Sequence, residues 1–139
     1  MGMYILTLAL PASLKEISYE SGIVFPESAS LEGSQFVPGG MDFSIYAKVR
    51  IDREDVDWFM ENGLSKATKE KPVFSKDYKM PADFAPPGRR AAKWWKPESV
   101  QDWVGTRFER DQYQNRTVYL LIDLDQGEHA TLYILLIQS

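Results

Sequence analysis

The sequence predicts an α+β fold: a mainly antiparallel sheet with a C-terminal hairpin, one main helix and a second short helix packed against it. Three patterns lead to this prediction. Residues 116–139 form two apolar arms around a polar turn, and both faces of each arm are apolar, as in strands that are covered above and below. Residues 41–51 alternate apolar and polar side chains, which is typical of a strand with one buried face. Residues 56–64 then place apolar side chains at helical spacing.

The first predicted strand is residues 4–10, an apolar run that Pro11 ends. The run is short and has no preceding Lys or Arg, so it does not resemble a signal peptide. We therefore expect a cytoplasmic protein by default, and export with a leader already removed is the alternative. Residues 12–40 are rich in Pro, Gly and Ser, and we expect irregular structure there, with short strands at 22–25 and 35–37.

The second strand, residues 41–51, leads directly into the main helix. Asp52 is a suitable N-cap, and the acidic residues just after it suit the positive end of the helix dipole. We predict the main helix over residues 54–62, with Gly63 placed to end it.

A long surface loop is predicted at about 65–90, because lysines and prolines alternate there without any helical or strand period. The second short helix is expected within residues 94–104, since Pro97 suits a first helical turn and Gly105 comes next as a stop. The residues C-terminal to the loop are too few to fold by themselves, so residues 1–139 are predicted to form a single domain.

The C-terminal hairpin is predicted as strands at 118–124 and 131–138, with Gly127 free to adopt a positive φ in the turn. This hairpin supplies the centre of the predicted sheet. The predicted core consists of the inward-facing apolar residues of the hairpin, the second strand and the main helix: Phe43, Ile45, Val49, Ile51, Val56, Phe59, Met60, Leu120, Ile122, Leu132, Ile134 and Leu136.

The composition excludes several classes of function. The chain has no cysteine, which excludes disulfides, thiolate catalysis and cysteine-ligated zinc. The formal net charge of -4 argues against nucleic acid as a partner, because nucleic-acid-binding domains are usually basic. No apolar run approaches the roughly 18 residues that a transmembrane segment needs.

Catalytic and metal-binding residues are not indicated either. The single histidine, His129, lies beside the hairpin turn, where a surface position is expected, and it has no Ser or Cys partner in a recognisable motif. The acidic turn resembles the start of a calcium-binding loop, but Gly127 stands one position too early and Ile134 occupies the place of the final Glu. We therefore predict no catalytic residue, no metal and no cofactor.

The most distinctive composition lies just after the long loop, where cations and tryptophans alternate. Three interpretations remain open. The tryptophans cover an end or a face of the sheet while the cations stay in water; the group binds an acidic protein or peptide; or it binds single-stranded nucleic acid, which the acidic chain disfavours. The candidate binding residues are Arg89, Arg90, Lys93, Trp94 and Trp95.

A resemblance to a known group of proteins adds to this interpretation. The sequence Trp94-Trp95 with Pro97 two residues later, then the hairpin at 116–123 and Tyr133, resembles small uncharacterised bacterial proteins, some of lipoprotein or immunity type. Residues 55–59, Asp-Val-Asp-Trp-Phe, are also similar. The likeness spans about two thirds of the chain, and its shared residues are packing residues. The lipobox cysteine of a lipoprotein is absent.

We expect a small non-catalytic domain that binds a protein or peptide, of the immunity kind that masks another protein. The alternative is a small hydrolase-type enzyme that uses carboxylates, with Asp123, Asp125 or Glu109 in a cleft under the long loop. A purely structural subunit is the third interpretation.

Overall fold

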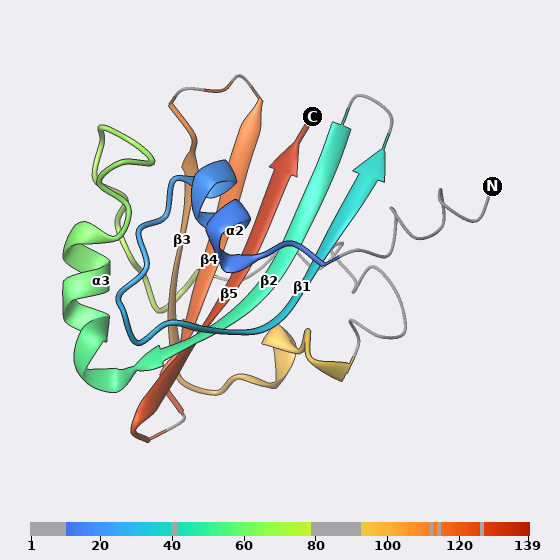
Figure 1. Ribbon diagram of the computed structural model, residues 1–139. Helices are drawn as coiled ribbons and strands as arrows, with labels where there is room; N and C mark the ends of the chain where they lie inside the picture. Colours follow the sequence, from blue (N-terminus) through green and yellow to red (C-terminus); the bar gives the residue numbers. More distant parts are fainter. Residues whose placement is uncertain (1–10, 40–41, 79–92, 112, 114, 126) are drawn as a thin grey trace.

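The computed structural model describes residues 11–39, 42–78, 93–111, 113, 115–125 and 127–139. These residues form a five-stranded antiparallel sheet with two short α-helices, so the predicted α+β class and the mainly antiparallel sheet are confirmed (Figure 1). In spatial order the strands are β1 (Ser30–Gly39), β2 (Asp42–Asp52), β5 (His129–Gln138), β4 (Arg116–Asp123) and β3 (Trp103–Glu109).

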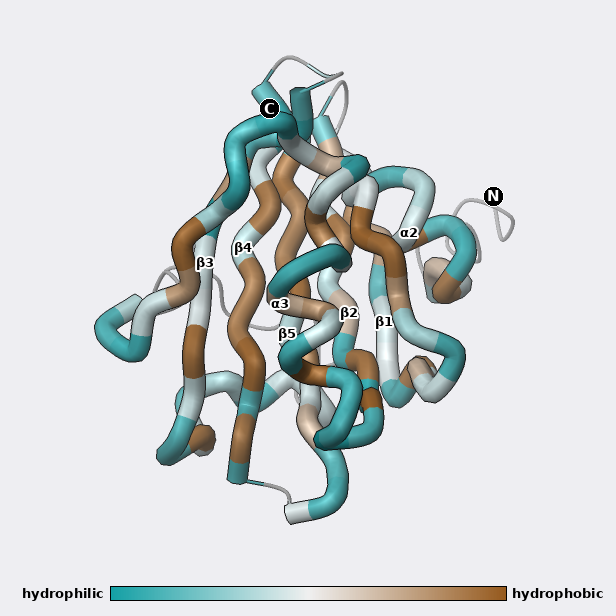
Figure 2. The backbone as a smooth tube through the Cα atoms, turned by 90° about the vertical axis from the view of Figure 1, so that its left-hand side faces the viewer, coloured by the Kyte–Doolittle hydropathy of each residue, from teal (hydrophilic) through white to brown (hydrophobic). Residues whose placement is uncertain are grey.

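The predicted C-terminal hairpin is confirmed as β4 and β5, and β5 is the central strand of the sheet. Leu120 pairs with Ile134 and Ile122 with Leu132, so the apolar side chains of the two arms lie in rows across the strands. Figure 2 shows hydrophobic residues along β4 and hydrophilic residues in the connections. Gly127 in the turn has φ of 69°, as the sequence predicts.

The main helix is shorter than predicted. The α-helix α3 covers Val56–Asn62, and a 3₁₀ turn, η1 (Arg53–Asp55), precedes it. Asp52 occupies the N-cap position of η1 but makes no side-chain capping bond, and the N-cap position of α3 itself is Asp55. Gly63 ends the helix as expected, and its N–H donates to the carbonyl of Phe59 at 2.7 Å. Val56 and Phe59 are the residues that the helix buries against the sheet.

The second helix lies elsewhere than predicted. α2 covers Leu14–Ser21, in a stretch for which irregular structure is the sequence expectation. A capping box starts it: the Ser13 hydroxyl accepts from the Glu16 N–H at 3.1 Å, and the Glu16 carboxylate accepts from the Ser13 N–H. Within 94–104 only the 3₁₀ turn η3 (Pro97–Ser99) forms, because β3 begins at Trp103 and takes the rest of that stretch.

β1 is ten residues long and is the largest strand that the sequence misses. Only its middle, 35–37, is predicted, and residues 22–25 form no strand. Ser, Gly and Pro punctuate β1, and its pairing with β2 shifts register between Leu31 and Gly33, so the period-2 pattern is interrupted. A β-bulge at an edge strand is the physical cause of this failure. The predicted strand at 4–10 lies outside the described residues.

Of the predicted long loop, residues 65–78 are described. They contain turns and an isolated bridge between Ser75 and Gly105 on the outer edge of β3. Residues 79–90 lie outside the described part of the chain. Among the described residues, no helix has the length and apolar character needed to cross a membrane.

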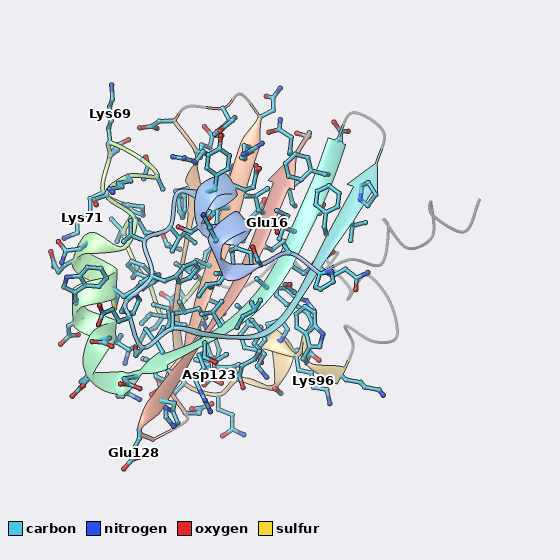
Figure 3. All side chains as sticks on the ribbon, viewed as in Figure 1. Glu16, Lys69, Lys71, Lys96, Asp123 and Glu128 are labelled. Carbon is cyan, nitrogen blue, oxygen red and sulfur yellow. The ribbon has the colours of Figure 1, made fainter. Side chains whose placement is uncertain are left out.

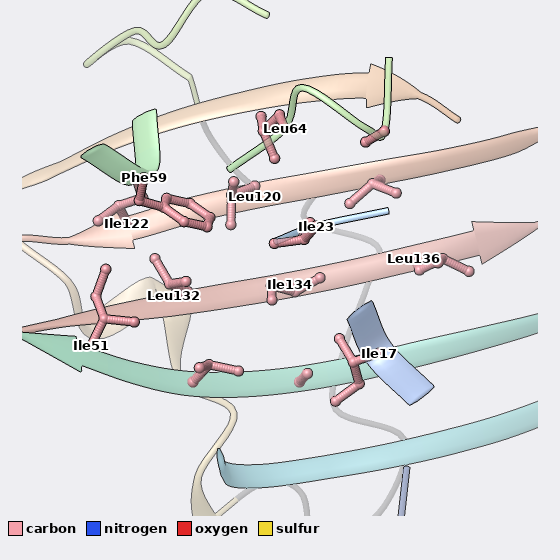
Figure 4. Close-up of a cluster of buried hydrophobic side chains, with 14 of the residues drawn as sticks. Ile17, Ile23, Ile51, Phe59, Leu64, Leu120, Ile122, Leu132, Ile134 and Leu136 are labelled. Carbon is pink, nitrogen blue, oxygen red and sulfur yellow. The ribbon is translucent and has the colours of Figure 1, made fainter. Parts of the chain in front are cut away.

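The main core lies between the sheet and the helices, on the face we call the first face (Figure 4). Ile122 of β4 and Phe59 of α3 are fully buried there, together with Ile17 of α2. All twelve predicted core residues belong to this cluster, ten of them buried and Phe43 and Met60 partly buried, so the predicted core is confirmed.

A buried cation fastens α2 to the sheet. Arg116, at the start of β4, is 5% exposed, and its guanidinium donates to the Glu20 carboxylate and to the Gln138 amide oxygen, each at 2.8 Å. The same guanidinium lies 3.9 Å from the centre of the Tyr113 ring. Charge-assisted bonds of this kind hold a short helix whose own apolar stripe is small.

Candidate functional site

The opposite side of the sheet, the second face, carries a separate aromatic cluster. Trp95 lies at its centre, 2% exposed, with its ring 5.0 Å from that of Tyr46 and 5.5 Å from that of Tyr133, both in edge-to-face geometry. Trp94 meets the Trp95 ring edge-on at 6.1 Å. Val100, Leu121 and Leu135 complete the buried cluster. The second face is therefore covered by the segment C-terminal to the long loop.

Trp94 lies over the backbone of β1. A Cβ atom built on Gly33 would lie 2.4 Å from the Trp94 ring, so only glycine permits this contact. Gly33 pairs with Lys48 of β2, which places Trp94 beside the middle of the second face. Lys93 and Lys96, on either side of the two tryptophans, are exposed.

The predicted binding residues thus occupy different environments. Lys93 is exposed, Trp94 is half-buried and Trp95 is buried in the aromatic cluster, whereas Arg89 and Arg90 lie outside the described residues. A ligand on this surface would contact Lys93 and Trp94 directly, and Trp95 would support Trp94 from beneath.

Next to the aromatic cluster lies a polar pocket, a cavity of about 150 Å³ on the second face. Side chains from four strands surround it. Figure 3 shows Asp123 at the end of β4 and Lys96 near the same end of the sheet, whereas Lys69 lies toward the opposite end. The lining residues are Glu32, Lys48, Arg50, Asp123, His129, Thr131 and Tyr133.

Strand register sets the arrangement of the polar pocket. Thr131 of β5 lies directly between Asp123 of β4 and Arg50 of β2, since it pairs with both. Tyr133, two residues further along β5, pairs with Lys48, whose ammonium nitrogen lies 5.7 Å from the centre of the tyrosine ring. Asp123, Thr131 and Tyr133 are 3–4% exposed and form the base of the polar pocket. The longer side chains of Lys48 and Arg50 line its side.

The cations of the second face form no ion pair with described acids. The ion pairs among the described residues are Lys71–Glu61 and Arg116–Glu20, and His129 Nδ1 lies 4.0 Å from the Asp52 carboxylate. Lys48, Arg50, Lys93 and Lys96 therefore have no described carboxylate within 4.0 Å. Each can bind a negatively charged group from outside the chain.

Tyr133 joins the two halves of the second face. Its ring packs on Trp95, and the same residue lines the polar pocket. Burial, and to a smaller extent the negative charges of Asp123, Glu98 and Glu32, raises the pKa of Tyr133 to about 12, and a hydrogen bond from the Lys96 backbone partly offsets this rise.

We expect the free energy of unfolding to fall as the pH rises from about 10 to about 12. The pKa of Tyr133 is raised in the folded state, so its contribution is complete below the unfolded pKa of 10.0 and is lost as the pH approaches 12. One such group contributes about 1.4 kcal/mol per pH unit over this window. Urea unfolding at several pH values measures the slope. Burial also raises the pKa of Tyr78 to about 12 and raises the pKa of Tyr46, so both residues add to the slope, and Tyr133→Phe should reduce the slope without abolishing it. An unchanged slope in this variant would contradict the prediction.

The carboxylates of the enzyme alternative do not share a cleft. Asp123 lines the polar pocket, whereas Glu109 lines an open groove of about 800 Å³ beside residues 68–73. Asp123 pairs with Trp103, six residues from Glu109 along β3, so roughly 20 Å of strand separates the two carboxylates. Asp125 instead accepts the Gln101 N–H at 2.7 Å.

The acidic turn and His129 also have structural roles. The Asp123 carboxylate accepts the Asp125 N–H at 2.8 Å, which closes the end of β4. His129 begins β5, and its side chain is 44% exposed, close to the surface position that the sequence predicts. No group of three His, Asp or Glu side chains within the described part of the chain is arranged to hold a metal ion.

Sequence reasoning finds Asp123 and His129 but misses the rest of the polar pocket. Lys48 and Arg50 look like the solvent face of an alternating strand, and Glu32 lies in a strand that the sequence does not reveal. Thr131 is a polar residue within an otherwise apolar strand. It is the one local indication in the sequence that this part of the second face is polar, whereas the part around Leu135 is apolar.

Comparisons with protein-family models, with curated proteins and with solved structures find no match for this chain. The fold and the second face are therefore interpreted from their own chemistry: an antiparallel sheet with helices on one side, and tryptophans, cations and a polar pocket on the other.

Proposed function

We propose that this protein is a non-catalytic module that binds a protein or peptide partner, in the manner of an immunity protein, and that the partner contributes an acidic segment. The observation that carries this proposal is the group of four cations around Trp94 on the second face, Lys48, Arg50, Lys93 and Lys96, which form no ion pair with a described residue. The resemblance of the sequence to small bacterial proteins of immunity type supports the same class.

The four cations come from two connected segments. Lys48 and Arg50 project from β2, and the Lys96 backbone bonds to Tyr133, the cross-strand neighbour of Lys48. Trp94 packs on Gly33 of the adjoining strand β1. A half-buried tryptophan flanked by cations is typical of interface centres, where an aromatic anchor supplies area and the cations select a partner of opposite charge.

The distribution of charge also favours an acidic partner. The chain carries a formal charge of -4, yet Lys93 and Lys96 are exposed on either side of Trp94, so an acidic partner would be directed to this segment rather than to the more acidic remainder of the surface. Arg89 and Arg90, which lie outside the described residues, would add to the same charge by their place in the sequence.

Capture from a lysate of the source organism, with bound proteins identified by mass spectrometry, tests the proposal. We expect the wild type to retain an acidic partner and the Lys93→Glu/Lys96→Glu variant to lose it, because reversed charges repel acidic groups. At moderate ionic strength, binding should weaken as salt is added.

The matched control is Lys66→Glu/Lys76→Glu, which makes the same charge change at exposed lysines away from Trp94. This variant should capture the partner as the wild type does. Equal loss in both variants would assign the effect to net charge, and equal capture by all three proteins would exclude the second face as the binding surface.

A further inference from the structure

We propose that the outer edge of β3 binds a short extended peptide, which adds to the sheet as an antiparallel strand and carries a basic, an apolar and an acidic residue in that order. The site is the edge groove, an open groove of about 800 Å³ between β3 and the loop after α3 (Figure 1). It is lined by residues 68–73 of the loop and by Arg107, Phe108, Glu109 and Asp111. This site goes beyond the partner binding proposed above, because Trp94 lies over β1, at the opposite edge of the sheet.

The backbone of β3 directs hydrogen-bonding groups into the edge groove. In an antiparallel ladder the N–H and C=O of one residue point the same way, and the direction alternates along the strand. Gly105 points away from β4, because it exchanges two hydrogen bonds, at 2.8 and 2.9 Å, with Ser75 of the loop. The Arg110 N–H instead donates to β4. Arg107 and Glu109 therefore point outward as Gly105 does, and on that side their backbone groups bond to no described residue.

The ends of the edge groove limit the length of the occupant. Ser75 occupies the position beside Gly105, and the Asp111 N–H donates to the Ala67 carbonyl at 3.1 Å. From Gly105 to Asp111 the strand extends over about 20 Å. The part that remains open between Ser75 and Ala67 therefore holds a strand of about three residues, roughly 10 Å long.

The strand β3 of a second copy does not fit in the edge groove. If its Glu109 stood opposite Arg107, its Asp111 would stand opposite Gly105, where Ser75 already lies. The occupant is therefore a flexible segment of another molecule, whose two ends can turn away from the sheet on either side of a short strand.

Antiparallel pairing suits an occupant of this length. A peptide residue opposite Arg107 and another opposite Glu109 would each exchange two hydrogen bonds with the edge, so a short segment satisfies all the outward backbone groups of both residues. In parallel pairing the same groups bond to alternate peptide residues that spread further along the strand. That longer segment would collide with Ser75 or Ala67 at the ends of the edge groove.

The side chains at the edge set the order of charges in the peptide. Arg107 and Glu109 are exposed, share one face of β3 and form no ion pair with a described residue. Opposed residues of paired strands point to the same face, so an acid opposite Arg107 and a base opposite Glu109 would pair with them. In antiparallel orientation the base comes first.

The middle residue of the peptide would be apolar. It would point to the opposite face of the sheet, as Phe108 does, because side chains alternate along a strand. Phe108 lines the edge groove, and Val73 of the loop, which is 83% exposed, adds apolar surface to the same lining. The edge groove therefore favours the order basic, apolar, acidic.

An NMR titration with the capped peptide N-acetyl-Gly-Lys-Val-Glu-Gly-amide tests the inference. We expect saturable shifts of the Arg107 and Glu109 amide signals at millimolar peptide. The peptide with its charges exchanged, N-acetyl-Gly-Glu-Val-Lys-Gly-amide, should bind at least about fivefold more weakly, because both cross-strand pairs become repulsive. The absence of saturable shifts with the first peptide, or equal affinity for the two peptides, would overturn the inference.

A methylated peptide separates strand addition from simple charge pairing. N-methylation of the lysine and glutamate amides in the first peptide removes the two backbone donors and keeps both charges, so binding should be lost. Binding as tight as that of the unmethylated peptide would overturn strand addition.

Hydrogen exchange of the free protein tests the geometry of the edge. The Arg107 and Glu109 amides should exchange with solvent clearly faster than those of Thr106 and Phe108, whose N–H groups face β4. Addition of the first peptide should slow the exchange of the Arg107 and Glu109 amides. Equal protection of all four amides in the free protein would contradict an open edge.

Exchanging the two charges on the protein should reverse the preference. Arg107→Glu/Glu109→Arg should bind the Glu-Val-Lys peptide at least about fivefold more tightly than the Lys-Val-Glu peptide. Both positions are exposed, so the fold should be retained. The control Lys15→Glu/Asp57→Lys exchanges charges at exposed residues outside the edge groove and should keep the wild-type preference. An unchanged preference in Arg107→Glu/Glu109→Arg would contradict the inference.

The variant Lys93→Glu/Lys96→Glu, used above for partner capture, should bind the Lys-Val-Glu peptide as the wild type does. Failure of partner capture and failure of this inference are therefore distinguishable.

Discussion

Replacing Ile122 with aspartate is expected to abolish folding. Ile122 is fully buried on the first face, pairs with Leu132 of β5 and lies close to Phe59 of α3 (Figure 4). The change removes roughly 1.5–3 kcal/mol of apolar burial and places a carboxylate with no partner in the core, which costs several kcal/mol more. The sum is about as large as the total stability of a typical domain, roughly 5–15 kcal/mol. Circular dichroism and urea unfolding of the purified variant measure the outcome.

The matched control is Val73→Asp. It makes nearly the same change of side chain at a position that is 83% exposed, so we expect a change in unfolding free energy of no more than about 0.5 kcal/mol. A soluble Ile122→Asp variant with a cooperative transition near that of the wild type would contradict the hairpin-centred core.

Replacing Trp95 with alanine is expected to reduce the free energy of unfolding by about 3–5 kcal/mol. The ring is 2% exposed and forms edge-to-face contacts with Tyr46, Trp94 and Tyr133, so the variant would leave a cavity at the centre of the second face. Its indole N–H is buried without a hydrogen-bond partner among the described residues, so the apolar ring contacts supply the stabilisation. Urea denaturation compared with the wild type measures the loss.

Trp58→Ala is the control for Trp95→Ala, because Trp58 is on α3 with 43% of its surface exposed. Trp58→Ala should reduce the free energy of unfolding by clearly less than Trp95→Ala does, by about 1 kcal/mol or below. Similar losses in the two variants would show that Trp95 is not the centre of a second core. The expected loss also explains why the partner-binding test uses lysines: a Trp95→Ala variant would weaken binding through structure alone.

The central strands could be predicted because their patterns are local. Residues 41–51 show a period-2 alternation, and β5 is apolar on both faces, so neither requires knowledge of the rest of the chain. The edge strand β1 could not be predicted at its full length, for a physical reason. An edge strand is paired on one side only, and β1 contains a bulge and several small residues. Its sequence alone therefore resembles a loop, and its pairing with β2 is what makes it a strand.

α2 illustrates a different failure. The Ser13 to Glu16 capping box is present in the sequence, but eight residues with few apolar side chains do not form a strong helical pattern. The helix is held by Arg116, which is 96 residues from Glu20 in the chain, through the Glu20 carboxylate and carbonyl. Tertiary contacts of this kind cannot be inferred from a local window.

The sequence by itself determined the antiparallel hairpin, the residues of the main core and the tryptophan-rich segment after the loop, because burial and strand periodicity are encoded in adjacent side chains. Only the tertiary structure decided which face Trp95 covers and which residues meet in the polar pocket. Glu32, Arg50, Asp123 and Thr131 stand on four different strands, and their proximity depends on the register of each pairing. Register is a property of paired strands, and a shift of one residue would turn each of these side chains to the other face.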